Sequence, residues 1–414
     1  MADPTVRPFV IHTPDTELDA LQQRLAATRW PDAETPSDWT QGLPLAYAEE
    51  LCAYWQSEYQ WREREAYFNG FPQFLTELDG LDIHFIHVQS AEALARPLLM
   101  THGWPGSVVE FHKVIGPLVD PVAYGGRAEE AFHVVCPSLP GYGFSAKPTQ
   151  TGWGVERIAT AWDALMQRLG YSRYFAQGGD WGSAVTTAIG LQNLGQCAGI
   201  HINMPNAGAP KDALANPDEK DKVALAGARY YAEWGAGYSK QQSTRPQTLG
   251  YGLVDSPMGQ AAWIIEKFYE WTDCQGHPEN ALSRQELIDN VMFYWLPGTG
   301  ASSARLYWES FGTAFGGGAE RQVSLPTGCS IFPKEIVATP RRWAQQRYPN
   351  IVYWNELDQG GHFAAFEQPE LLCRNFVPAL EKWFYNRRTE YITGGLEHGR
   401  SVKHQWPQSC FRRT

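Results

Sequence analysis

Short runs of apolar residues alternate with amphipathic stretches through the middle of the chain. Each apolar run has the length of a buried strand and is followed by apolar positions at helical spacing. The expected strands are residues 97–100, 132–136, 174–176 and 198–202, and the expected helices are residues 108–118, 155–169 and 184–189. Because strands that alternate with helices form parallel sheets covered on both faces, we predict an α/β fold with a mostly parallel sheet.

The alternation stops near residue 206 and resumes near residue 329. Residues 207–322 have mostly helical patterns and many aromatic residues, without a clear strand–helix unit, so we interpret them as an inserted helical cap. Three glycines at 316–318 predict a flexible exit from this cap. The later expected strands are residues 329–332 and 351–354, and the later expected helices are residues 340–347 and 369–385.

The first part of the chain is expected to form an arm that leads into the sheet. Pro14 and Asp15 predict a helix start, a second helix is expected at residues 45–55, and Asp79-Gly80 predicts a turn before a strand at residues 83–88. We therefore expect five segments: the arm (1–85), the first part of the core (86–206), the cap (207–322), the second part of the core (323–388) and a loosely packed tail (389–414).

Composition narrows the class of protein. A chain of 414 residues is longer than one compact core usually holds, which agrees with several segments. A hydrophobic content of 43% with 19% charged residues is typical of a globular protein and excludes a disordered one. The formal net charge of −11 argues against a nucleic-acid partner, because such partners need a basic face.

Cysteine usage and hydropathy bear on the compartment. The seven cysteines are scattered without a C-x-x-C motif, which argues against a disulfide framework or a zinc site and favours a reducing compartment. No run of about 18 apolar residues predicts a membrane span. The first residues lack the apolar region of a signal peptide, so we expect a soluble, cytoplasmic protein.

The most informative motif is Gly-x-Asp-x-Gly at residues 178–182, between an expected strand and an expected helix. This is the pattern of a nucleophile elbow, with Asp180 at the position that serine usually occupies. The glycines are required because side chains at Gly178 and Gly182 would collide with the neighbouring strand or helix. The motif therefore predicts that Asp180 is a nucleophile at the carboxyl end of the sheet.

Two further residues complete a predicted catalytic triad in the order nucleophile, acid, histidine. His362 follows the last expected strand, where the base belongs. The acid that orients its imidazole is predicted to be Glu335, and Asp358, four residues before the histidine, is the alternative.

An aspartate nucleophile limits the chemistry. Attack on an acyl carbon would form a mixed anhydride, which gives an esterase no advantage, whereas attack on a saturated carbon forms an alkyl ester that activated water can hydrolyse. An epoxide and an alkyl halide both suit this route. Epoxide opening needs hydroxyl donors such as tyrosine for the alkoxide, whereas halide release needs N–H donors and no proton.

Several motifs together resemble one family. They are residues 102–106 (His-Gly-Trp-Pro-Gly), 140–145 (Pro-Gly-Tyr-Gly-Phe-Ser), 178–183 (Gly-Gly-Asp-Trp-Gly-Ser) and 360–365 (Gly-Gly-His-Phe-Ala-Ala). This set is similar to the epoxide hydrolases of the α/β-hydrolase fold. The motifs Tyr59-x-Trp61-Arg62 and Asn69-x-Phe71-Pro72-x-Phe74 resemble the arm of the microsomal-type branch. The resemblance extends over about residues 8–385.

The resemblance implies roles for residues of this chain. Asp180 is then the nucleophile, His362 the base and Glu335 the acid, and the substrate is a small-molecule epoxide with no metal or cofactor. Tyr238 and Tyr307 match the two tyrosines of the cap that bind the epoxide oxygen. The backbone N–H groups of Trp104 and Trp181 form the oxyanion hole. Animal members carry an N-terminal membrane anchor, which we do not expect here, and a homodimer is left open.

Three other functions fit parts of the pattern. A haloalkane dehalogenase shares the aspartate nucleophile, but Trp104 stands where dehalogenase-like relatives carry a halide-binding asparagine. A serine esterase is disfavoured because Ser183 lies outside the elbow position. Separately, His102 is expected to shape its loop rather than to act as a base. A ligand-binding protein without activity is disfavoured because all triad positions are filled.

Overall fold

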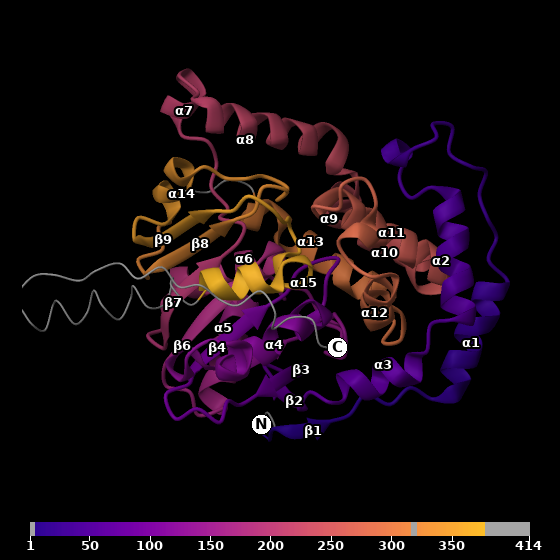
Figure 1. Cartoon of the computed structure of the whole chain (residues 1–414), viewed down its shortest axis with the longest axis horizontal. Coiled ribbons are helices and arrows are strands. Elements are labelled where there is room, and N and C mark those ends of the chain that lie inside the picture. Colours follow the sequence, from indigo (N-terminus) through magenta and orange to yellow (C-terminus); the bar gives the residue numbers. More distant parts are fainter. Residues whose placement is uncertain (1–4, 316–320, 377–414) are drawn as a thin grey trace, which may run out of the picture.

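A central sheet organises the fold in the computed structural model, which describes residues 5–315 and 321–376 (Figure 1). Within these residues, nine strands pair in the order β1-β2-β3-β5-β4-β6-β7-β8-β9. The strands are β1 (Arg7–Phe9), β2 (Gln73–Leu78), β3 (Leu81–Val88), β4 (Arg96–Thr101), β5 (Phe132–Pro137), β6 (Tyr174–Gly178), β7 (Cys197–Ile202), β8 (Thr327–Ile331) and β9 (Ile351–Glu356). Pairing is antiparallel from β1 to β5 and parallel from β5 to β9, as the α/β prediction requires.

Helices flank the sheet on either side of the central strands. Those within the core are α4 (His112–Val119), α5 (Val155–Arg168), α6 (Asp180–Gln192), α14 (Arg341–Arg347) and α15 (Ala364–Glu367). All five residues of β6 are buried, so side chains on both faces of the sheet are covered. A short 3₁₀ helix, η2 (Val108–Phe111), precedes α4, where the sequence predicts a single helix.

The turn between β2 and β3 follows from its sequence. Asp79 and Gly80 both have positive φ, of 50° and 79°, and Leu78 pairs with Leu81 across the turn. A two-residue turn with positive φ at both positions matches the twist of the strands that it joins. The predicted turn is therefore confirmed, and the strand after it, β3, begins at Leu81 rather than at residue 83.

The chain between β7 and β8 contains helices and no strand among the residues that the structure describes. The helices are α7 (Lys211–Ala215), α8 (Glu219–Tyr230), α9 (Gly237–Thr244), α10 (Pro246–Asp255), α11 (Pro257–Trp271), α12 (Arg284–Trp295) and α13 (Gly300–Phe315). We refer to α7–α13 as the helical insertion. The predicted exit at 316–318 and the predicted tail at 389–414 lie outside the described residues, and the segment boundaries stay predictions.

The N-terminal arm packs against the helical insertion rather than against the sheet alone. Its helices are α1 (Asp15–Ala26), α2 (Leu45–Ser57) and α3 (Trp61–Phe68), and α1 and α2 lie beside α11 (Figure 1). The sequence pattern does not predict α3 or the short edge strand β1. Arg64 of α3 forms a 2.8 Å ion pair with the buried Asp289 of α12, whose carboxylate also accepts a hydrogen bond from Tyr59.

The hydropathy of the helices and the state of the cysteines can be read from the structure. None of the helices in the described ranges combines the length and the apolar character that a bilayer crossing requires. The six cysteines in those ranges are buried and form no disulfide with one another, namely Cys52, Cys136, Cys197, Cys274, Cys329 and Cys373.

The ion pair between the arm and the helical insertion yields a stability prediction. Arg64→Leu leaves the fully buried Asp289 carboxylate without its cation, and we expect the free energy of unfolding to fall by about 3–5 kcal/mol in urea denaturation. Arg7→Leu is the control, because Arg7 and Asp82 are both about half exposed, and it should cost at most ~1 kcal/mol. Equal losses in the two variants would contradict this account of the arm.

Candidate active site

The turn between β6 and α6 holds Asp180 in an unusual backbone conformation. Its φ is +48°, in the left-handed region that residues other than glycine rarely adopt. A Cβ on Gly178 would lie 2.1 Å from the carbonyl oxygen of Gly182, and a Cβ on Gly182 would lie 1.8 Å from that of Thr101. Both glycines are thus required by the close approach of helix and strands, which agrees with the predicted elbow.

The carboxylate of Asp180 lies between a backbone donor and an imidazole. Its Oδ1 accepts a 2.7 Å hydrogen bond from the backbone N–H of Trp104, in the loop after β4. Its Oδ2 lies 3.4 Å from Nε2 of His362. Gly103 leaves room for this arrangement, because a Cβ there would lie 2.1 Å from Oδ1 of Asp180. Three segments far apart in the sequence therefore meet at one carboxylate.

His362 is oriented by two groups. Its Nδ1 lies 2.5 Å from Oε1 of Glu335, and its backbone N–H donates a 2.8 Å hydrogen bond to the carbonyl of Trp271, at the end of α11. The contact with Glu335 directs Nε2 toward Asp180. Of the two acids considered from the sequence, Glu335 is buried and contacts the imidazole, whereas Asp358 is exposed to solvent.

The two carboxylates determine the charge of His362. Burial by itself lowers the pKa of the imidazole, but the charges of Glu335 and Asp180 outweigh burial and raise that pKa well above its ordinary value. The imidazole is therefore protonated while both carboxylates are ionised. Neutralising Asp180 removes one of the two charges, which lowers the pKa of His362 and favours the neutral base.

Tyr238 and Tyr307 approach the same carboxylate from the helical insertion. Tyr238 lies on α9 and its ring stacks on the indole of Trp104, with centroids 4.9 Å apart, while Tyr307 lies on α13. Burial raises the pKa of both phenols well above 10, so both remain proton donors at neutral pH. The buried hydroxyl of Tyr307 has no hydrogen-bond partner among the described residues, which is typical of a group that faces a ligand.

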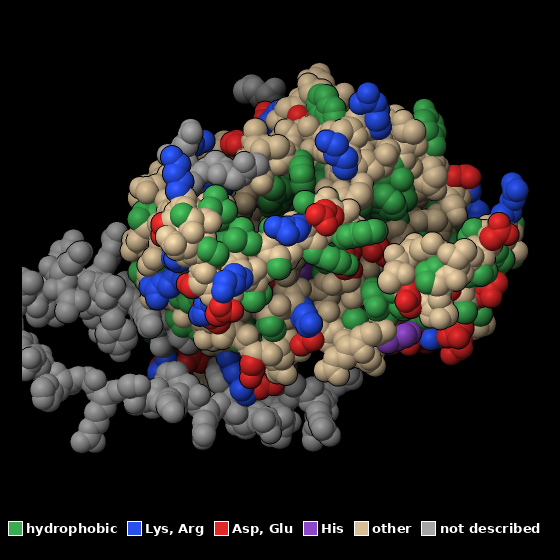
Figure 2. Space-filling view, turned by 90° about the horizontal axis from the view of Figure 1, so that it is seen from above, with side chains coloured by type: hydrophobic (Ala, Val, Ile, Leu, Met, Phe, Trp, Pro, Cys, Tyr) green, Lys and Arg blue, Asp and Glu red, His purple; other side chains and the backbone are tan. Residues whose placement is uncertain are grey.

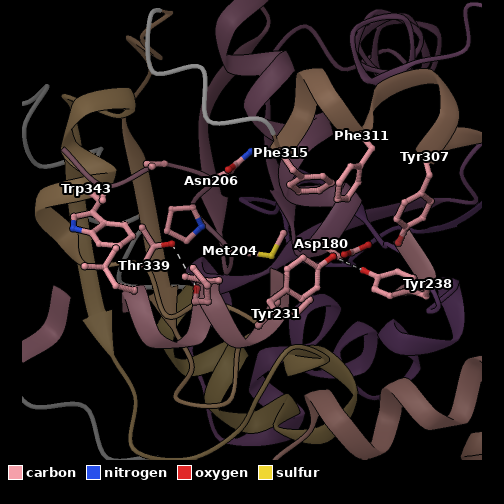
Figure 3. A pocket seen from close by; sticks show the side chains of 18 residues that line it. Asp180, Met204, Asn206, Tyr231, Tyr238, Tyr307, Phe311, Phe315, Thr339 and Trp343 are labelled. Carbon is pink, nitrogen blue, oxygen red and sulfur yellow. Dashed lines mark hydrogen bonds between the residues drawn. The ribbon is translucent and has the colours of Figure 1, made fainter. Parts of the chain in front are cut away.

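These groups share one end of an elongated cavity of about 320 Å³. Asp180, Tyr238 and Tyr307 lie at this end, and Thr339 and Trp343 lie at the other (Figure 3). Most of the side chains between them are apolar, including Met204, Leu225, Phe311, Phe315, Ile336 and Val337. Seen from above, hydrophobic side chains also gather around a hollow in the surface (Figure 2). The cavity therefore suits an uncharged, apolar ligand.

Two other residues considered from the sequence occupy supporting positions. The indole of Trp181 is buried against the ring of Tyr307, with centroids 4.8 Å apart. Both ring nitrogens of His102 are used within the core, because Nδ1 lies 2.9 Å from the carbonyl of Gly103 and Nε2 accepts the N–H of Leu139. Burial lowers the pKa of His102 to about 4. The expected role of His102 in shaping its loop agrees with these contacts.

Two residues near the site have no signal in the sequence. The hydroxyl of Tyr231 lies 3.2 Å from that of Tyr238, and the two are joined by a hydrogen bond in Figure 3. Tyr231 begins a π-helical turn, a feature that is frequent at functional sites. Glu110 is buried beside Asp180 and His362. The sequence does not indicate Tyr231, because it is one of many tyrosines in the helical insertion. It does not indicate Glu110, because that residue lies within an expected helix.

The helical insertion holds the loops that carry the site. On α12, Asn290 donates a hydrogen bond to the carbonyl of Pro105 and Tyr294 donates one to the carbonyl of Gly106. On α13, the carbonyl of Ser303 accepts a hydrogen bond from Tyr142. The loops at 102–107 and 138–145 are thus held by the helical insertion as well as by the strands that precede them. Within residues 5–315 and 321–376, no three His, Cys, Asp or Glu side chains are grouped to hold a metal ion.

Two family models match the chain. The epoxide hydrolase N terminus matches residues 6–111, and the alpha/beta hydrolase fold matches residues 96–249. The first match includes the arm and the loop that carries Trp104, and the second includes the elbow. Together they extend from β1 into the helical insertion.

Relatives are similar over most of the chain. A protein of Stigmatella aurantiaca, provisionally named an epoxide hydrolase, is 54% identical, over 89% of this chain and 83% of its own length. Epoxide hydrolase 1 of Oryctolagus cuniculus is 36% identical, over 92% of this chain and 90% of its own.

Solved structures are similar as well. The juvenile hormone epoxide hydrolase of Bombyx mori superposes with a TM-score of 0.86 at 31% identity, over 93% of this chain and 96% of that chain. The epoxide hydrolase of Aspergillus niger gives 0.82 at 32% identity, over 92% of this chain and 97% of that chain.

The electrostatic coupling at the site predicts a shift in a titration. Asp180→Asn keeps the shape of the side chain but removes its charge, so the pKa of His362 should be lower in the variant than in the native protein. Histidine-resolved ¹⁵N NMR titration measures this difference, with His133, whose pKa is lowered by burial alone, as the internal control. An unchanged His362 titration would show that Asp180 does not raise its pKa.

Proposed function

We propose, because the chain belongs to the epoxide hydrolase family, that it converts an epoxide to a vicinal diol through a covalent ester on Asp180. The enzyme class follows from the relatives and the two matched families. The observation that carries the proposed route is the position of Asp180, between the N–H of Trp104, the imidazole of His362 and two tyrosine hydroxyls. This arrangement supports a carboxylate nucleophile whose ester is hydrolysed in place.

In the first step, Oδ2 of Asp180 attacks one carbon of the epoxide, and the electron pair of the broken C–O bond passes to the epoxide oxygen. Tyr238 and Tyr307 donate hydrogen bonds to this oxygen, and one of them supplies its proton. The product of this step is an alkyl ester of Asp180 that carries one new hydroxyl group. Since Asp180 is no longer charged, the pKa of His362 falls, and the imidazolium gives its proton to the tyrosinate, which restores the tyrosine and leaves a neutral base.

In the second step, Nε2 of His362 takes a proton from water, whose oxygen attacks the ester carbon of Asp180. Oδ1 becomes the oxyanion and is stabilised by the N–H of Trp104. The second donor that we propose is the N–H of Trp181, because the residue after the nucleophile supplies one donor of the oxyanion hole in this fold. Glu335 supports the protonated imidazole, which then protonates the departing diol oxygen. The second proton of the water passes from the regenerated carboxyl group to His362, which restores the imidazolium and the Asp180 carboxylate.

The alternatives fit the site less well. Halide release needs N–H donors opposite Asp180, whereas the groups on that side of the cavity are tyrosine hydroxyls. Ser183 donates its hydroxyl to the carbonyl of Met204, so it is not placed as an esterase nucleophile. A halide-release assay beside a diol assay separates a dehalogenase from the proposed enzyme. Turnover of styrene oxide by the purified protein excludes a ligand-binding role without catalysis.

The shape of the cavity supports a class of substrate. An epoxide held at Asp180 has its substituent directed along the apolar lining toward Trp343. We therefore expect uncharged epoxides with an apolar substituent as substrates. We also propose a cytoplasmic location, and the proposal extends to either a monomer or a homodimer.

The ester intermediate should accumulate when its hydrolysis is blocked. In His362→Gln the base is absent while Asp180 still attacks, so incubation with a substrate epoxide should add the mass of that epoxide to the protein, on the peptide that contains Asp180. Intact-mass and peptide mass spectrometry make the measurement. His362→Gln/Asp180→Asn is the control and should gain no mass. No adduct in His362→Gln at a time when the native enzyme turns over would contradict the ester route.

The two acids considered from the sequence can be separated by matched substitutions. Glu335→Gln removes the charge next to Nδ1 of His362, and we expect kcat to fall by about 10²–10⁴-fold. Asp358→Asn changes an exposed side chain and should leave kcat near the native value. If Asp358→Asn alone abolishes turnover, the assignment of Glu335 is wrong.

A further inference from the structure

A second, much smaller cavity lies on the core side of Asp180. Its volume is about 20 Å³, and its lining includes Asp180, His362, Glu110, Gln177 and Asn203. One water molecule needs about 10–15 Å³ of such space and two to four polar partners. The cavity thus has the size and the polar lining to hold a single water molecule.

Two polar groups of this cavity have unused hydrogen-bonding capacity. Oε1 of Gln177 is buried and has no hydrogen-bond partner among the described residues, and the buried Nε2 of His362 has only its 3.4 Å ion-pair contact with Oδ2 of Asp180. The side-chain amide of Gln177 is held toward Asn203 by a 3.3 Å hydrogen bond. Buried polar groups of this kind are normally satisfied by protein or ordered water, so a water molecule here has ready partners.

Glu110 is the acidic residue of this cavity that the proposed mechanism does not use. It lies on η2, and the loop before it leaves space for its carboxyl group, because a Cβ on Gly106 would lie 1.5 Å from Oε1 of Glu110. No Lys or Arg forms an ion pair with it within the described ranges. Burial and the negative charge of Asp180 raise the pKa of Glu110 to about 8, and the positive charge of His362 opposes this rise only in part. Its carboxyl is therefore mostly protonated at neutral pH and can both donate and accept a hydrogen bond.

We propose that Glu110 is a positioning residue that holds the hydrolytic water in the small cavity, between Nε2 of His362 and the ester carbon of Asp180. The inference rests on the proposed ester route, which it extends by giving the water its site. One hydrogen of the water points to His362, and Glu110 fixes the oxygen by a hydrogen bond of its own. Glu110 gains and loses no proton over the cycle, so the proton balance of the second step is unchanged.

This placement separates the two steps in space. The epoxide enters through the large apolar cavity that contains Tyr238 and Tyr307, whereas the water approaches Asp180 from the small polar cavity. Asp180 lines both cavities. Water can therefore be in place before the ester forms, without competing with the apolar substrate for space.

Substitution of Glu110 tests the proposal through the two half-reactions. In Glu110→Leu, which has a similar size and no polar group, hydrolysis of the alkyl-enzyme should slow by about 10²-fold while formation of the alkyl-enzyme changes by less than about threefold. Rapid-quench mass spectrometry with excess epoxide measures both rates, and the ester should accumulate. Glu110→Gln is the matched control, because its amide also donates and accepts, and it should restore most of the hydrolysis rate.

Other outcomes overturn the proposal. Equal slowing of both half-reactions in Glu110→Leu would show a general distortion of the site, and unchanged rates would show that Glu110 does not act on the water. If the leucine variant does not fold, an experimental structure of the native enzyme decides: an ordered water within hydrogen-bond distance of Glu110 and His362 supports the site, and an empty cavity overturns it. Failure to form any alkyl-enzyme in His362→Gln would instead contradict the ester route itself.

Discussion

The structure of the site depends on a steric constraint at the turn between β6 and α6. Side chains at Gly178 and Gly182 would lie about 2 Å from backbone atoms of α6 and of β4, respectively, so only glycine permits this approach. The approach places Asp180 at a positive φ with its carboxylate against the N–H of Trp104. A non-glycine residue in this conformation costs of order 1–3 kcal/mol, and such strain persists where the surrounding structure over-determines the position. Here the buried strands and α6 supply that surrounding structure.

The remaining groups reach Asp180 because the helical insertion fixes the loops of the core. The end of α11 accepts the backbone N–H of His362, α12 holds the loop before Glu110, and α13 holds the loop at 138–145. The N-terminal arm in turn contacts the insertion through the ion pair of Arg64 and Asp289. The arm and the helical insertion therefore support the positions of Asp180, His362 and Glu335, in addition to covering the site. This coupling explains how a site built from four separate segments keeps distances of hydrogen-bond length.

The parts that could be predicted from the sequence are those set by local patterns. Buried strands are continuous apolar runs, and Asp180 is indicated by two glycines at fixed spacing, so the α/β fold and the elbow follow from the residues alone. The choice between Glu335 and Asp358 could not be settled, because chain order does not say which carboxylate reaches the imidazole. Glu110 was missed for a related reason: its burial depends on the space above Gly106, which only tertiary packing defines.

The central claim is that Asp180 forms a bond to the substrate and recovers its oxygen from water. A single turnover in H₂¹⁸O, with enzyme in excess over epoxide, tests this claim directly. Because the ester is cleaved at the carbonyl carbon of Asp180, the account predicts ¹⁸O in the peptide that contains Asp180 and none in the diol. Label in the diol and none in Asp180 would mean that water attacks the epoxide directly, which would contradict the account.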